Sequence, residues 1–448
     1  MANIQPIRAI VYNVLKVPDI SAVVTPPYDV ISAEERDAFH QRDPHNIIRL
    51  ILGKPYPTDT LSDNPHTRAA ATLRQWLDEG ILVREPSPTI YLTAIDFETR
   101  GKRLTRWGFI AGVQLEPFEK GIVLPHETTF SRVKSERLGL IQACNANLSP
   151  IFSIYSDPQN RLIENIRSAI AASNRPEPDI AFMDSEGQGH RVWKLTDPGL
   201  QQLISDHLKE CPVLIADGHH RYETALQYRD MVLCRHPEYG KNHPVNFVMM
   251  YLTAMEAPGL VVLPAHRMVH RIDPERLAAM LEMVRPYFRV EEVEAEDLGP
   301  EGLAARLEQR LLQSDTGSRI GLIRRDHPRI LVLELKPGVM KKRYGDEFAD
   351  TLLDLDVTVL TRLLLMDILG LNSQDLDDEA RIRYSKSASQ AMASVFAGRC
   401  DLAFILNPTR VDQVRRAAAA GQIMPRKSTY FYPKVITGLA LHPLWENP

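Results

Sequence analysis

The chain has 448 residues, of which 44% are hydrophobic and 25% charged, a globular composition whose length suits two or three domains. A net charge of −4 disfavours nucleic acid or an anionic membrane surface as the main partner. The four cysteines show no CxxC or Cys/His spacing, which disfavours a structural zinc site and a disulfide framework. The start MANIQPIRAI lacks the features of a signal peptide, and the longest apolar run, VNFVMMYLTAM, is too short to span a bilayer. We therefore expect a cytoplasmic protein without a membrane partner; the sequence leaves its oligomeric state open.

The N-terminal stretch places polar residues between a strand and a helix. IRAIVYN (7–13) is strand-like, and PPYDVIS (26–32) leads into a helix that Ser32 and Glu35 should start as a capping box. Asp29 suits Mg²⁺ or a substrate amine, and Tyr28 suits a stacked base. A turn aspartate and a core tyrosine explain the pair equally well.

Further helices and hairpins follow before the first candidate base. We expect a helix at 66–79 and a hairpin over 89–116. LPHETTF then sets His126 beside Glu127. Because phosphoryl transfer to an alcohol needs a carboxylate near the hydroxyl proton, Glu127 is the first choice for the base, and His126 is a candidate phosphate contact. The alternative is an exposed loop.

A helix follows that loop, and it carries basic residues on one face. Lys134 and Arg137 are three residues apart on it and should share that face, either to reach phosphate or to be solvated.

A strand-to-helix corner in VLIADGHHRYETAL (213–226) carries the strongest signal. VLIA is a short buried strand, Asp217 and Gly218 make the turn, and a helix begins near His219. A helix start presents unpaired N–H groups and a positive dipole end, which suit phosphate, and Arg221 adds a bidentate fork. His219 and His220 are candidates for phosphate binding and acid/base catalysis; either ring could instead be structural. Asp217 could orient a histidine, bind Mg²⁺ or form a turn.

After about residue 270 the chain changes to alternating helices and strands. We expect helices at 274–286, 299–314 and 350–369 with strands over 319–336. Near the end, MPRKSTYFYPK (424–434) combines basic residues and hydroxyls, so Lys427 and Ser428 are candidate phosphate ligands and Tyr430 a candidate substrate contact. An edge strand with a solvated lysine is the alternative.

Four motifs in this order, PPYDVIS, LPHETT, ADGHHRYETAL and MPRKSTYFYPKVITGL, resemble the family called domain of unknown function 1015 over nearly the whole chain. The corner also resembles the ParB/sulfiredoxin-like fold, whose members hold nucleotide phosphates at this helix start. The resemblance implies an α+β fold: a nucleotide-binding core with mixed sheets over 1–270, and a C-terminal α/β region over 271–448 that closes the site. Unlike sulfiredoxins, this chain has His219 in place of the reactive cysteine.

Free-serine kinases of that fold carry a similar DGHHR corner, and they phosphorylate the hydroxyl of free L-serine from a nucleotide. By this resemblance the chain is expected to be a nucleotide-dependent small-molecule kinase that uses Mg²⁺ with ATP or ADP. Its partners would be the nucleotide and a small hydroxylated metabolite such as L-serine. In that scheme Glu127 is the base, His220 assists proton transfer, and Asp217 or Asp29 holds the metal. The alternatives are a nucleotide- or metabolite-binding regulator without turnover, and a hydrolase of nucleotides or phosphate esters.

Overall fold

The computed structural model describes residues 2–127, 131–293, 299–313 and 317–446. It divides the chain into two compact units. Unit 1 comprises Met1–Pro125, Thr129–Val261 and Pro433–Pro448, and unit 2 comprises His126–Thr128 and Val262–Tyr432. The sequence predicts two regions, 1–270 and 271–448, whereas in the structure the segment after Tyr432 belongs to the first unit.

Unit 1 is built on a mixed sheet in the order β6-β11-β8-β12-β5-β4-β10-β9, with β1 paired to β5. β6 runs parallel to β11 and β8 parallel to β12, while the other pairs are antiparallel. The small pairs β2-β3 and β7-β21 lie outside this sheet. The strands are β1 Ile4–Gln5, β2 Ile10–Tyr12, β3 Leu82–Arg84, β4 Ile90–Thr99, β5 Lys102–Gln114, β6 Val123–Leu124, β7 Ala146–Asn147, β8 Ile151–Tyr155, β9 Ile180–Met183, β10 Gly189–Leu195, β11 Val213–Asp217, β12 Phe247–Ala254 and β21 His442–Pro443.

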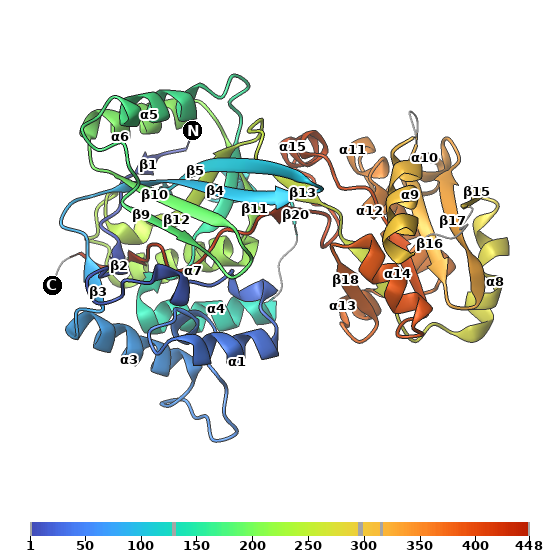
Figure 1. Cartoon of the computed structure of the whole chain (residues 1–448), viewed down its shortest axis with the longest axis horizontal. Helices are drawn as coiled ribbons and strands as arrows, with labels where there is room; N and C mark the ends of the chain where they lie inside the picture. The colour runs from blue at the N-terminus through green and yellow to red at the C-terminus, as the bar shows by residue number, and fades with distance from the viewer. Residues whose placement is uncertain (1, 128–130, 294–298, 314–316, 447–448) are drawn as a thin grey trace. The chain divides into compact units, whose positions relative to one another are not determined.

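Helices cover both faces of that sheet. Figure 1 shows α5 and α6 on one face and α1, α3, α4 and α7 on the other. Apolar residues of α5 and α6 complete the main core with the central strands. The helices are η1 Ile20–Ala22, η2 Tyr28–Val30, α1 Ala33–Arg42, α2 Ile48–Ile51, α3 Pro65–Asp78, η3 Phe118–Lys120, α4 Ser131–Cys144, α5 Arg161–Ala171, α6 Pro198–Leu208, α7 His219–Arg235 and η4 Pro244–Asn246.

Local sequence signals explain where several of these elements begin. The predicted capping box is present, since the Glu35 N–H donates to Ser32 Oγ at 3.2 Å and the Ser32 N–H donates to Glu35 Oε2 at 2.8 Å. The predicted buried strand is β12, in which every residue is buried. Each of these features depends on neighbours in the sequence, and each was predictable.

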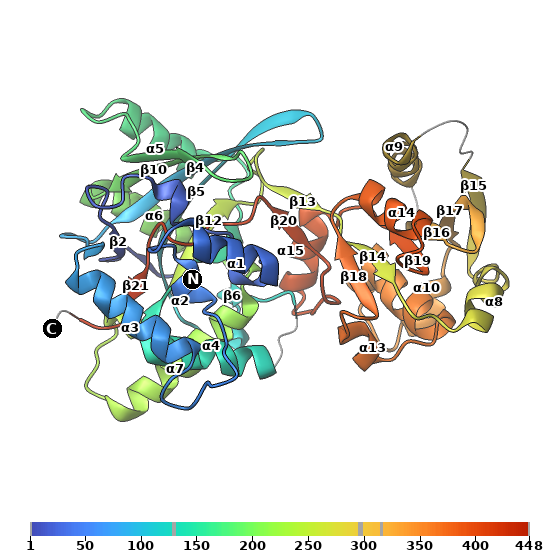
Figure 2. The same cartoon turned by 60° about the horizontal axis from the view of Figure 1, so that its bottom comes forward.

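Unit 2 contains an antiparallel sheet in the order β15-β17-β16-β19-β14-β18. Helices α9 and α14 pack together on one face of it (Figure 2), and their apolar residues form the core with β16, β17 and β19. The strands are β13 Val261–Leu263, β14 His266–Val269, β15 Phe288–Val293, β16 Arg319–Arg324, β17 His327–Leu335, β18 Ile382–Ser385, β19 Leu402–Ile405 and β20 Tyr430–Tyr432, of which β13 pairs with β20.

The helices of unit 2 differ from prediction at one place. The expected single helix over 350–369 is divided near Asp354 into α11, α12 and the π-helix η5. Apolar spacing predicts a helical segment but does not reveal such a break. The helices are α8 Pro274–Val284, α9 Pro300–Leu312, α10 Val339–Tyr344, α11 Asp350–Leu353, α12 Asp356–Thr358, η5 Val359–Ile368, α13 Ser373–Asp377, α14 Ala388–Phe396 and α15 Val411–Ala419.

The predicted α+β class with mixed sheets is confirmed. Across the described ranges, no helix is both long enough and apolar enough to cross a bilayer.

Candidate functional site

The β11–α7 corner in unit 1 has the backbone of an anion site. Gly218 joins Asp217 at the end of β11 to His219 at the start of α7, with φ 97° and ψ 29°. The left-handed conformation favours glycine here, and a Cβ at this position would lie 2.9 Å from the guanidinium of Arg221, which would have to move. The N-terminus of the 17-residue α7, with its positive dipole end, therefore lies at this corner, and helix N-termini of this kind favour anions.

Charged side chains from distant segments meet at this corner. Asp217 lies between two cations: its Oδ2 is 3.3 Å from Nη2 of Arg221, and its Oδ1 is 3.4 Å from Nζ of Lys434. Arg221 also donates through Nη1 to the carbonyl of Pro150. All three charged side chains are at least four-fifths buried. Two cations, one anion and a helix N-terminus leave the corner with a positive potential, as an oxyanion site requires.

The two predicted histidines differ in exposure. His219 is 4% exposed and buried in the fold, whereas His220 is partly exposed. His220 is therefore the more accessible candidate for proton transfer.

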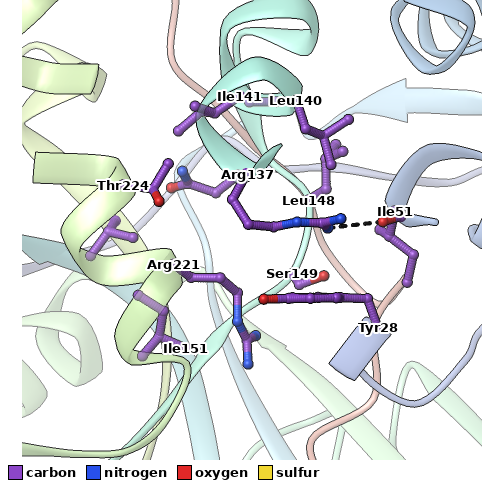
Figure 3. A pocket seen from close by; sticks show the side chains of 13 residues that line it. Tyr28, Ile51, Arg137, Leu140, Ile141, Leu148, Ser149, Ile151, Arg221 and Thr224 are labelled. Atoms are coloured by element: carbon purple, nitrogen blue, oxygen red, sulfur yellow. Dashed lines mark hydrogen bonds between the residues drawn. The ribbon is translucent and has the colours of Figure 1, made fainter. Parts of the chain in front are cut away.

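Tyr28 lies beside Arg221, as Figure 3 shows. The Arg137 guanidinium carbon lies 3.9 Å from the centre of the Tyr28 ring, so this cation stacks on the ring. Burial is the main reason that the pKa of Tyr28 rises to about 12, with Asp29 adding to it. The phenol thus stays protonated as a hydrogen-bond donor, while Asp29 itself is exposed.

The predicted metal role of Asp217 stays a prediction. Both of its carboxylate oxygens face cations. Over the part of the chain that the structure describes, no three His, Cys, Asp or Glu residues gather as a metal site. Because Mg²⁺ bound with a nucleotide commonly takes only one or two protein carboxylates, Asp217, which contacts Arg221 and Lys434, stays a candidate ligand.

His126 and Glu127 form a second group, in unit 2, with the MPRKST motif. His126 is 1% exposed, and its Nε2 lies 3.1 Å from Oγ1 of Thr429 in a hydrogen bond. Glu127 Oε1 accepts a hydrogen bond from the N–H of Lys427 at 3.0 Å. The candidate base therefore also holds the backbone of a candidate phosphate ligand.

The loop around Lys427 is held from several sides. Lys427 has a left-handed backbone (φ 52°), which costs a non-glycine residue free energy and needs support. Arg267, 2% exposed, donates through Nη2 to the carbonyls of Arg426 at 3.2 Å and Lys427 at 3.0 Å. The hydroxyl of Ser428 donates to the Pro425 carbonyl. Thus Ser428 is occupied in holding the loop, whereas the side chain of Lys427 is exposed.

Tyr430, predicted to contact substrate, lies in β20. Its ring is partly exposed, and Nζ of Lys386 lies 5.8 Å from the ring centre.

The predicted residues thus fall into two groups, with the PPYDVIS motif and the corner in unit 1, and the His126–Glu127 and MPRKST motifs in unit 2. Sequence reasoning missed Lys434 in the first group. Lys434 stands in the same motif, directly after the strand, but it lacks the neighbouring hydroxyl residues that make Lys427 a candidate phosphate ligand.

Comparison with known proteins gives a family and weak structural likenesses. The family described as "Protein of unknown function (DUF1015)" matches residues 4–358. No curated protein matches the chain. Three similar solved structures are a conserved hypothetical protein from Pyrococcus furiosus (14% identity, TM-score 0.34, 71% of this chain and 92% of that chain), a free serine kinase in complex with AMP (12%, 0.33, 71% and 89%) and SbnI with C-terminal truncation from Staphylococcus aureus (9%, 0.33, 75% and 87%). Likenesses of this strength say nothing of activity.

Proposed function

Because the chain belongs to the DUF1015 family of proteins of unknown function, we propose its function from the chemistry of its own residues: it is a nucleotide-dependent phosphotransferase that acts on the hydroxyl of a small metabolite. ATP or ADP is the donor. The DGHHR corner resembles that of free-serine kinases, which makes free L-serine or a similar metabolite the first acceptor to test.

The corner at Gly218 carries this proposal. A left-handed glycine opens a long helix, and Arg221 and Lys434 lie on either side of Asp217 beside it. The helix N–H groups and the two cations suit the oxygens of a terminal phosphate. Charge that develops on a transferred phosphoryl group is stabilised by the same donors, so the corner suits transfer as well as binding.

The remaining roles follow from residue chemistry. His220 is assigned to proton transfer near the phosphate. Glu127 is assigned as the base that takes the proton of the acceptor hydroxyl, and Lys427 as a phosphate contact. Mg²⁺ is expected with the nucleotide, and Asp217 or Asp29 is its candidate protein ligand.

A single assay separates the proposal from its alternatives. The full chain is incubated with Mg²⁺, L-serine and ATP or ADP, and products are followed by phosphorus NMR. We expect O-phosphoserine or another phosphate ester. Free phosphate alone would indicate a hydrolase, and unchanged nucleotide with a measurable binding signal would indicate a regulator.

Two arginines on α7 provide a matched pair of variants for this assay. Arg221 and Arg229 are similarly buried, each donates through Nη1 to a main-chain carbonyl and each contacts an aspartate. The corner predicts that Arg221→Gln lowers turnover at least tenfold through loss of about 1.5–3 kcal/mol of charge-assisted hydrogen bonding. Arg229→Gln should keep it. Equal losses in both variants would show that the effect is structural and would count against the corner.

A further inference from the structure

A cavity in unit 1 lies directly behind the corner. It has a volume of about 60 Å³ and lies between α4, α7, β8 and Tyr28. In Figure 3 the side chains of Arg137 and Tyr28 reach across it one above the other, and Arg221 enters it from α7. Arg221 is thus shared between the cavity and the corner.

Polar atoms in the wall of the cavity lack partners. Nε of Arg137, Nε of Arg221 and Oγ1 of Thr224 are buried, and no described residue forms a hydrogen bond with any of them. Thr224 is only 3% exposed. Leaving a buried donor unsatisfied costs about 1–3 kcal/mol, so three of them around one cavity indicate a polar occupant.

The chemistry of these atoms selects an anion. The Nη atoms of both arginines already serve carbonyls and carboxylates: Ile51 and Glu136 for Arg137, and Pro150 and Asp217 for Arg221. The Nε–H groups are donors only, and the threonine hydroxyl can also donate. Three donors suit a group that only accepts, and a carboxylate offers two oxygens with about four acceptor positions.

The size and the other walls limit that anion to a small one. A single water needs roughly 10–15 Å³ of such space, so the cavity has room for about four or five non-hydrogen atoms, too few for a purine. The walls away from the three donors are mostly aliphatic, including Leu140, Ile141, Leu148 and Val248. Because such walls make a doubly charged phosphate costly to bury, a singly charged carboxylate fits better.

We propose that this cavity binds the carboxylate of the acceptor, which makes the acceptor a short hydroxy acid or hydroxy amino acid. This inference rests on the proposed function, because only phosphotransfer makes the bound molecule an acceptor. The carboxylate site itself can be tested without turnover.

The binding test compares propionate with propionamide, which has nearly the same shape but no charge. Thermal unfolding of the full chain is followed in each, with sodium chloride matching the ionic strength. Propionate should raise Tm in proportion to the logarithm of its concentration above Kd, and propionamide should not.

Thr224→Val removes the hydroxyl and keeps the shape, so it leaves the fold intact. It should abolish at least nine-tenths of the propionate affinity. Thr358→Val, which changes another buried threonine without a hydrogen-bond partner among the described residues, is the matched control in unit 2 and should keep that affinity. No propionate response in the wild type, or an equal response in all three proteins, would overturn the site.

Kinetics then connect the site to the acceptor. The wild type should use L-serine at least tenfold better than serinol, which carries a second carbinol in place of the carboxylate. Thr224→Val should raise KM for L-serine about tenfold or more, the equivalent of one charge-assisted hydrogen bond, without changing KM for the nucleotide. Equal use of L-serine and serinol would refute the carboxylate site but not phosphotransfer. If the nucleotide is never consumed, phosphotransfer is refuted, and the propionate experiment still decides whether the carboxylate site exists.

Discussion

Gly218 is the residue on which the corner depends most. Its φ of 97° is strained for any other residue, and a Cβ would also meet the Arg221 guanidinium at 2.9 Å. We expect Gly218→Ala to abolish detectable nucleotide binding, because the side chain must displace Arg221 from the helix N-terminus. Isothermal titration calorimetry with ADP measures this.

Gly187 offers a control that separates strain from contact. It also has a positive φ, 76°, but nothing lies within 4 Å of a Cβ built there. Gly187→Ala therefore carries a similar backbone cost of about 1 kcal/mol without disturbing the corner. Loss of binding in both variants would mean that reduced stability, rather than the corner, explains the result.

At the scale of elements, the loop that carries Lys427 allows two roles of Glu127 to be separated: the proposed catalytic base, and a hydrogen-bond acceptor that holds the loop. The carboxylate accepts the Lys427 N–H, and a glutamine in its place retains an acceptor oxygen for that bond. If Glu127 is the base, Glu127→Gln should lower kcat by about 100-fold or more while leaving Tm and nucleotide affinity unchanged. An unchanged kcat would restrict Glu127 to holding the loop.

Arg267→Met serves as the complementary variant at this loop. It removes the support of the Arg426 and Lys427 carbonyls and keeps the Glu127 carboxylate. If Arg267 stabilises the fold through this loop, Arg267→Met should have a lower Tm than the wild type. Glu127→Gln should keep the wild-type Tm.

The sequence predicts elements well where the signal is local. The corner was predictable because the end of the strand, the glycine and the first residues of the helix are consecutive in the sequence. The Ser32 capping box likewise spans four residues. The pairing of Lys434 with Asp217 was not, because more than 200 residues separate the two and only the folded chain brings them together. The break near Asp354 escaped prediction because an apolar pattern continues across it.

For the whole molecule, His442 predicts how stability depends on pH. The ring is 3% exposed in β21, and burial lowers its pKa to about 4. In the unfolded chain the pKa is about 6.5, so the unfolded state binds the proton more readily. Stability is therefore fully present above about pH 6.5 and falls as the pH drops toward 4, by up to about 3 kcal/mol from this group.

Urea unfolding between pH 7 and 4 measures that loss. In His442→Gln the slope of the unfolding free energy against pH should fall by the equivalent of nearly one bound proton. His236→Gln, which changes an exposed ring, should keep the wild-type slope. A wild-type slope that persists in His442→Gln would assign the acid sensitivity to other groups.

The return of the chain to unit 1 after Tyr432 has a consequence for synthesis. On the ribosome, Asp217 and Arg221 emerge long before Lys434, and the Val262–Tyr432 part of unit 2 is translated in between. A nascent polypeptide therefore lacks one of the two cations of the β11–α7 corner until Lys434 has been translated. Products of premature termination between Val262 and Tyr432 should remain inert and open to proteases, which makes synthesis of the segment after Tyr432 a precondition for activity.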